Sequence, residues 1–173
     1  MENRIEQALS VLVGLPLWDS GRAADLQWFH FGKSRTVITR KGTSKEVGDY
    51  ALHVQCAWRI LASDSIVVGS SDLYYPPGNP RDRPDDFDWE VPEGNRRDQR
   101  IRLFMQEHAA QPLVVTSVEA DKVGSIRLSL THGYSMEVFP DDSVNDEYSE
   151  HWRLFQPSTE TEHFVITGRG IET

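Results

Sequence analysis

The sequence has little cysteine and no long apolar run. Its only cysteine, Cys56, cannot form an internal disulfide, and its place in an alternating apolar stretch predicts a small buried side chain in a reducing compartment. No stretch approaches the ~20 apolar residues that a membrane-spanning helix requires. Charged residues interrupt the apolar positions of residues 1–20, so no signal-peptide pattern is present there. We therefore expect a cytoplasmic protein that does not bind membranes.

The common catalytic and cofactor-binding motifs are also missing. The sequence has no G-x-G-x-x-G, no G-x-S-x-G, no paired C-x-x-C and no H-E-x-x-H. The tripeptide Gly32-Lys33-Ser34 resembles the end of a phosphate-binding loop, but Gln27 stands where that loop has its first glycine. These absences favour a protein that is not an enzyme and has no cofactor or metal. A site assembled from distant residues would need none of these motifs.

Basic residues are outnumbered by acidic ones. The 18 Lys and Arg stand against 27 Asp and Glu, which gives a net charge of −9. This excess disfavours attraction to nucleic acid or to anionic membrane and favours a basic protein partner. A hydrophobic content of 38% is sufficient for a packed core, and 173 residues fit one globular domain, residues 1–173.

The apolar pattern predicts an α+β fold in which a predominantly antiparallel sheet is accompanied by two helices. Asn3 can cap an N-terminal helix with Glu6 as its reciprocal partner, and Asn95 can cap a second helix near 96–109. Between them, residues 76–95 form a long Pro-rich loop that Phe87 and Trp89 could pin to the domain. Strands are predicted at 26–31, 36–40, 52–60, 66–68, 113–119, 126–130, 134–139 and 164–167.

Two details of the strand pairing can be predicted. The unbroken alternation over 52–60 predicts one strand with a core-facing side, and 36–40 is expected to return beside 26–31. A three-residue loop of 131–133 matches the apolar faces of its two strands, because it pairs Leu128 with Met136 and Ile126 with Val138. A two-residue loop would mix polar and apolar faces instead.

The strongest site candidate is a run of carboxylates that leads into His151. The run consists of Asp141, Asp142, Asp146, Glu147 and Glu150. As an EF-hand loop beginning at Asp141 it lacks the glycine at position six and the glutamate at position twelve, where Asp146 and Trp152 stand. Three alternatives stay open: a solvated or arginine-paired loop, a partner-binding surface, and an irregular metal site.

A cluster of arginines provides a test of these alternatives. Arg96, Arg97 and Arg100 lie in the first turns of the second predicted helix, where positive charge opposes the partial charge of the helix terminus. Carboxylates should therefore compensate them, either from the loop at 76–95 or from the acidic run. Arginines that lie against the acidic run would indicate a structural role for it. Arginines placed elsewhere would leave the run as the preferred binding face.

Three segments resemble a family of small bacterial proteins of unknown function. They are GLPLWDSGRAADLQWFHFG at 14–32, DYALHVQCAWRI at 49–60 and EVFPDD at 137–142. The resemblance covers most of the chain. It implies a compact α+β domain and supplies no substrate and no set of catalytic residues.

Two functions are consistent with these observations. The first is a non-enzymatic cytoplasmic binding domain with an acidic partner-binding face, and an immunity-like protein that neutralises a basic toxin is one form of it. The second is a small-molecule-binding protein or hydrolase-like enzyme whose pocket includes Glu150 and His151 together with Tyr148 and Trp89. A module that serves only as a structural interaction partner would instead form a stable homodimer.

Overall fold

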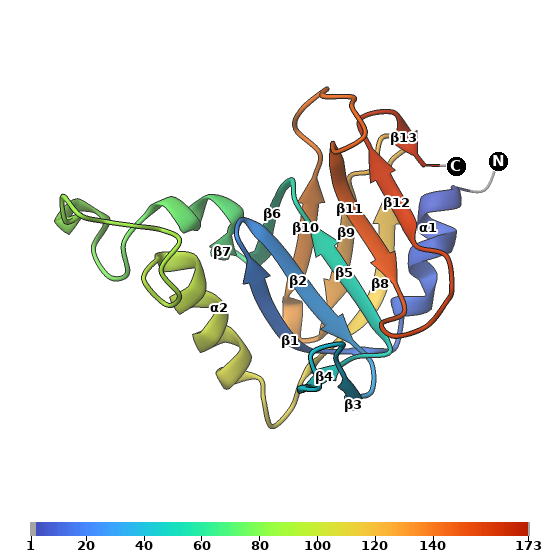
Figure 1. Ribbon diagram of the computed structural model, residues 1–173, viewed down its shortest axis with the longest axis horizontal. Coiled ribbons are helices and arrows are strands. Elements are labelled where there is room, and N and C mark those ends of the chain that lie inside the picture. Colours follow the sequence, from blue (N-terminus) through green and yellow to red (C-terminus); the bar gives the residue numbers. More distant parts are fainter. Residues whose placement is uncertain (1–2, 173) are drawn as a thin grey trace.

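A single large antiparallel sheet dominates the fold (Figure 1). The computed structural model describes residues 3–172. Eleven strands follow the spatial order β13-β12-β11-β5-β2-β1-β8-β9-β10-β6-β7, and each pairs antiparallel with its neighbours. The predominantly antiparallel sheet and the two helices are therefore present as predicted, but the sheet is so large that the chain is mainly β with some helix rather than strictly α+β.

The sheet folds over into two layers. The first layer contains β1 (Pro16–Ala23), β2 (Leu26–Phe31), β5 (Tyr50–Val54), β11 (Glu150–Phe155), β12 (Phe164–Thr167) and β13 (Gly170–Ile171). The second layer contains β6 (Ala57–Leu61), β7 (Ile66–Gly69), β8 (Leu113–Ala120), β9 (Ile126–Leu130) and β10 (Ser135–Phe139). Figure 1 shows β2, β5 and β11 in front of β8, β9 and β10. One core between the layers takes side chains from both, among them Phe29 and Trp152 from the first and Leu128 and Met136 from the second.

The predicted strand at 52–60 is two strands that belong to different layers. Strand β5 pairs with β2 and β11, whereas β6 pairs with β10 and β7. Between them the backbone amides of Gln55 and Cys56 both donate to the carbonyl of His151, at 2.8 and 3.3 Å. Buried and exposed positions still alternate from Leu52 to Ile60, because both strands face the same core. A period of two therefore continues through the crossover, and the pattern alone predicts one strand.

Two other strand predictions have opposite outcomes. The return of 36–40 beside 26–31 is wrong, because β3 (Arg35–Ile38) pairs with β4 (Ser44–Val47) in a separate two-stranded sheet. The register across 131–133 is confirmed, since Leu128 lies opposite Met136 and Ile126 opposite Val138. Both His132 and Gly133 in that loop adopt positive φ, at 59° and 76°.

Both predicted helices are present. In α1 (Arg4–Leu9), Asn3 caps the first turn through the amide of Ile5, but Glu6 accepts from the amide of Ala120 at 2.9 Å and does not bind back to Asn3. In α2 (Arg96–Glu107), Asn95 caps the amide of Asp98 at 2.9 Å. Helix α1 contacts β8, and α2 contacts β1 and β7. Within residues 3–172, no helix combines the length and the apolar character needed to cross a membrane.

Short 3-10 turns complete the connections, at η1 (Ser10–Leu12), η2 (Ser70–Tyr74), η3 (Pro80–Asp82) and η4 (Thr131–Gly133). The Pro-rich loop at 76–95 contains only η3 as regular structure. Trp89 packs edge-on against Tyr74 with ring centroids 5.9 Å apart, whereas Phe87 packs against Arg83 of the same loop. Arg22 also holds the loop, because its Nη2 donates to the carbonyl of Trp89 at 3.1 Å. Of the two predicted anchors, Trp89 therefore has the contact outside the loop.

Candidate functional site

The predicted acidic run forms an exposed connection between β10 and β11. We call residues 141–150 the acidic segment. Asp142 and Asp146 each bend the chain locally, since their Oδ1 atoms accept from the amides of Val144 at 3.0 Å and Tyr148 at 2.8 Å. The carbonyl of Val144 lies so close to Gly168 that a Cβ on that glycine would be 2.1 Å from its oxygen. The acidic segment therefore has defined turns and a fixed contact with the β12–β13 connection.

Two carboxylates of the acidic segment have an arginine or histidine side chain beside them. Glu150 accepts from Nε of Arg153 at 2.6 Å and from its Nη2, and this hydrogen bonding raises the pKa of Arg153. Asp142 lies 4.0 Å from Nδ1 of the buried His151. Among residues 3–172, the other three carboxylates have no cationic group within 4.0 Å, and they are Asp141, Asp146 and Glu147.

The arginines at the start of α2 find their partners elsewhere. Arg96 forms an ion pair with Asp72 at 3.3 Å. Arg97 is buried and donates to the carbonyl of Asp25 at 3.0 Å. In the described part of the chain, none of Arg96, Arg97 and Arg100 forms an ion pair with the acidic segment. No ion pair among residues 3–172 therefore joins these arginines to the acidic segment, which stays a candidate binding face, although Arg97 and Asp141 line the same cavity.

The side chains predicted to form a pocket have different surroundings. Trp89 packs on Tyr74, Tyr148 is 82% exposed, and His151 is buried beneath Asp142. Glu150 instead lines a cavity of about 710 Å³ together with Arg153 and other residues of the β11–β13 region. Neither Trp89 nor Tyr148 nor His151 lines that cavity.

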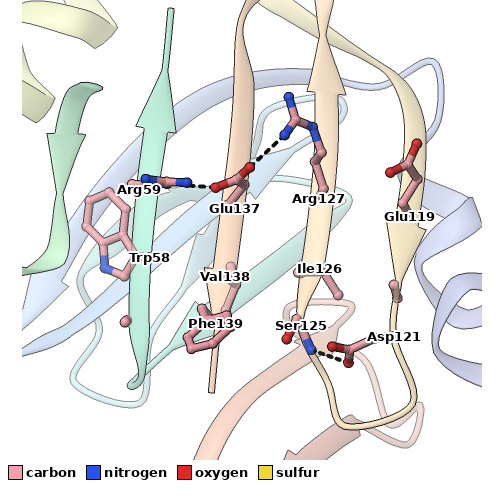
Figure 2. Close-up of a pocket in the computed structure, with 12 residues that line it drawn as sticks. Trp58, Arg59, Glu119, Asp121, Ser125, Ile126, Arg127, Glu137, Val138 and Phe139 are labelled. Carbon is pink, nitrogen blue, oxygen red and sulfur yellow. Dashed lines mark hydrogen bonds and ion pairs between the residues drawn. The ribbon is translucent and has the colours of Figure 1, made fainter. Parts of the chain in front are cut away.

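A second cavity, of about 620 Å³, lies on the outer face of the second layer (Figure 2). Glu137 on β10 bridges Arg59 on β6 and Arg127 on β9, with both distances at 2.6 Å. Strand register also puts Glu119 opposite Arg127, so two acidic and two basic side chains alternate across four strands. Charges on this face are therefore matched among themselves. This row could not be predicted from the sequence, because the four residues become neighbours only once the strand order is known.

Two histidines of the first layer, His30 and His53, have pKa values that burial lowers. Nδ1 of His30 accepts from the amide of Gly48 at 2.9 Å, and burial lowers the pKa of His30. Burial also lowers the pKa of His53 to about 4, and the neighbouring His30 and Arg153 add to this effect. Such imidazoles accept hydrogen bonds and pack without carrying a proton at neutral pH. We assign both to the structure of the first layer.

Comparisons with known proteins add no relative from which residue roles could be transferred. No protein-family model, no curated protein and no solved structure matches the chain. Among residues 3–172, no group of three or more His, Cys, Asp and Glu side chains is placed to hold a metal ion. A functional assignment therefore rests on the contacts of the residues themselves.

Proposed function

We propose that this protein is a non-enzymatic binding protein whose acidic segment docks a basic protein partner. The observation that carries this proposal is the set of exposed carboxylates that have no cationic group of residues 3–172 within 4.0 Å, namely Asp141, Asp146 and Glu147. Several exposed carboxylates in a single segment produce a local negative potential. A cationic partner surface would complete their ion pairs.

The overall charge supports the same kind of partner. A net charge of −9 attracts a basic protein over a longer range than the segment alone and accelerates its association. A basic toxin is one partner of this chemistry, and an immunity-like protein would neutralise it by covering its cationic surface. We propose the cytoplasm as the compartment, because the single Cys56 cannot form an internal disulfide.

Apolar side chains within the acidic segment provide contact area. Tyr148 is 82% exposed and Val144 is 53% exposed, and both lie among the carboxylates. Tyrosine is enriched among the residues that contribute most to binding energy at protein interfaces. The local turns at Asp142 and Asp146 reduce the conformational entropy that the segment would lose on binding. Tyr148 is therefore the expected anchor, with the carboxylates around it.

A pair of charge-matched variants tests this proposal. The first variant combines Asp146→Asn with Glu147→Gln in the acidic segment. The control combines Glu160→Gln with Glu162→Gln, two exposed acids of the β11–β12 connection. Both variants have a net charge of −7, since each removes two negative charges from −9. Quantitative mass spectrometry would compare what each immobilised protein captures from a lysate of the cells that make it.

We expect a basic protein that the wild type and the control retain and that the first variant and Tyr148→Ala lose. With that protein purified, the first variant should weaken its affinity at least about tenfold, and rising salt should weaken the wild-type complex. Equal retention by both charge variants would contradict the proposal, because only the position of the lost charges differs between them.

A further inference from the structure

Arg97 is a buried arginine without an acidic partner. Its side chain is 2% exposed, and no carboxylate of residues 3–172 lies within 4.0 Å of it. Its Nη2 donates to the carbonyl of Asp25 at 3.0 Å, and its Nη1 reaches the carbonyl of Ser70 only at 3.5 Å. Its buried Nε has no hydrogen-bond acceptor among residues 3–172. A buried guanidinium ordinarily has a carboxylate or another anion beside it, because an unpaired buried charge is costly.

The guanidinium keeps its charge at neutral pH. Burial and the nearby Arg22 lower the pKa of Arg97 to about 10, against the opposite effect of Asp98 and Asp25, and this value lies well above 7. The ring of Trp58 lies below the guanidinium at 5.9 Å. This contact supplies only a weak substitute for an anion. Within the described chain, the charge of Arg97 is therefore balanced only by carboxylates beyond ion-pair distance, and its Nε has no hydrogen-bond acceptor.

Arg97 lines a small cavity between η2, the β5–β6 crossover and the start of the acidic segment. The cavity holds about 180 Å³. Pockets for drug-sized ligands hold roughly 300–1,000 Å³, so only a small molecule fits here. The hydroxyl-bearing residues Ser71 and Tyr74 also line the cavity and can donate or accept hydrogen bonds.

Two acidic residues, Asp25 and Asp141, line the same cavity and are exposed. Neither has a cationic group within 4.0 Å among residues 3–172. A cavity with a buried cation and exposed carboxylates repels a multiply charged anion through the carboxylates and a simple cation through the arginine. The arrangement is complementary to a ligand that carries one charge of each sign.

Cys56 gives the cavity no nucleophile. Burial, together with the charge of Asp141, raises the pKa of its thiol to about 12. A thiol rather than a thiolate is therefore present at neutral pH, and the thiolate is the reactive form. The cavity is suited to binding rather than to covalent catalysis.

We propose that this cavity binds a small zwitterion, such as a short amino acid, with its carboxylate on Arg97 and its ammonium group towards Asp25 and Asp141. The ligand carboxylate replaces the anion that the buried guanidinium lacks. The two exposed carboxylates select for the ammonium group.

Titration calorimetry on the full chain tests this site with defined probes. Glycine, L-alanine, L-serine and γ-aminobutyrate serve as zwitterions. Acetate and ethylamine each carry only one of the two charges, and inorganic phosphate carries only negative charge. We expect saturable binding of at least one zwitterion and binding at least about tenfold weaker for each of acetate, ethylamine and inorganic phosphate. If no zwitterion binds saturably, or if acetate or phosphate binds as tightly, the proposal is wrong.

Variants locate the site. Arg97→Met should abolish zwitterion binding while keeping most of the buried volume. Asp25→Asn should weaken zwitterion affinity about tenfold without weakening the binding of acetate, and this exposed position keeps the test valid if Arg97→Met does not fold. Asp64→Asn, an exposed acid in the β6–β7 turn, is the matched control and should change neither. Zwitterion affinity that survives Asp25→Asn unchanged would overturn the assignment. Asp25 lies outside the acidic segment, so this outcome is independent of partner docking.

Discussion

At the scale of single residues, Gly168 holds the acidic segment in position. A Cβ at this residue would lie 2.1 Å from the carbonyl oxygen of Val144, so Gly168→Ala must displace the segment from the β12–β13 connection. We expect faster amide hydrogen exchange at Val144 and Tyr148, and a loss of roughly 1 kcal/mol in the free energy of unfolding. Gly69→Ala is the control, because its Cβ would meet its nearest atom at an ordinary 3.6 Å. Unchanged exchange in Gly168→Ala would show that this contact does not fix the segment.

His53 makes stability depend on pH. Burial lowers its pKa from 6.5 to about 4, so the unfolded chain binds a proton more readily than the folded one. The contribution to stability is therefore complete above pH 6.5 and is lost as pH falls towards 4. Urea unfolding at about pH 7.5 and about pH 5 should show this loss, on the order of 1 kcal/mol after allowance for partial solvent screening.

The variant His53→Gln should reduce this pH dependence, because it removes the group that titrates. His132→Asn, at an exposed position, should retain it. The buried His30 should contribute in the same direction, since burial lowers its pKa as well. A pH dependence that is identical in His53→Gln and in the wild type would contradict the assignment to His53.

At the scale of elements, one ion pair joins β1 to α2. Arg22 and Asp98 lie 2.7 Å apart, with side chains only 11% and 12% exposed. Asp98→Ala leaves the charge of Arg22 with little compensation and should lower the free energy of unfolding by about 3 kcal/mol. By contrast, Arg59→Ala breaks a more exposed pair on the face shown in Figure 2 and should cost less than about 1 kcal/mol. Urea titrations of both variants measure the difference, and equal losses would contradict this ranking.

The elements also show how far the sequence predicts the fold. The pairing of Leu128 with Met136 is local, since a short loop and matched apolar faces determine it. The division of 52–60 between two layers depends on distant partners, namely β11 for β5 and β10 for β6. Strand β1 carries a mixed pattern of intermediate burial and was not predicted at all. Long-range pairing, rather than local pattern, decides these cases.

The candidate sites follow the same distinction. The acidic segment is contiguous, so its residues can be predicted as a group from the sequence alone. The cavity at Arg97 is assembled from η2, the β5–β6 crossover, α2 and the loop after β10. Its acidic members, Asp25 and Asp141, are more than a hundred positions apart in the chain. Only the fold brings them to one place.

At the scale of the whole molecule, the two layers should unfold together. Among residues 3–172, the strand ladders of the two layers meet only at Pro16–Val114 and Leu17–Leu113, but the layers share one core. Leu128→Ala, at a fully buried position of the second layer, should cost about 2–5 kcal/mol. Tryptophan fluorescence and far-ultraviolet circular dichroism should shift together, because the core is common to both layers. Separate transitions for the two signals would show that the layers are independent units.

Self-association of the chain stays a prediction that light scattering can test. The chain is acidic as a whole, so contacts between like-charged copies are opposed by long-range repulsion. Docking of a basic partner, by contrast, would reduce the net negative charge of the complex. The proposed binding function therefore depends most on whether the acidic segment contacts such a partner.

Site-specific photocrosslinking measures that contact directly. A photoreactive phenylalanine analogue is placed at Tyr148 in one protein and at Glu160 in a second, both at exposed positions. Each protein is irradiated in a lysate of the cells that make it. The account predicts a crosslink from position 148 to a basic protein, absent from position 160 and suppressed by Asp146→Asn with Glu147→Gln. No specific crosslink at 148, or the same products from both positions, would contradict it.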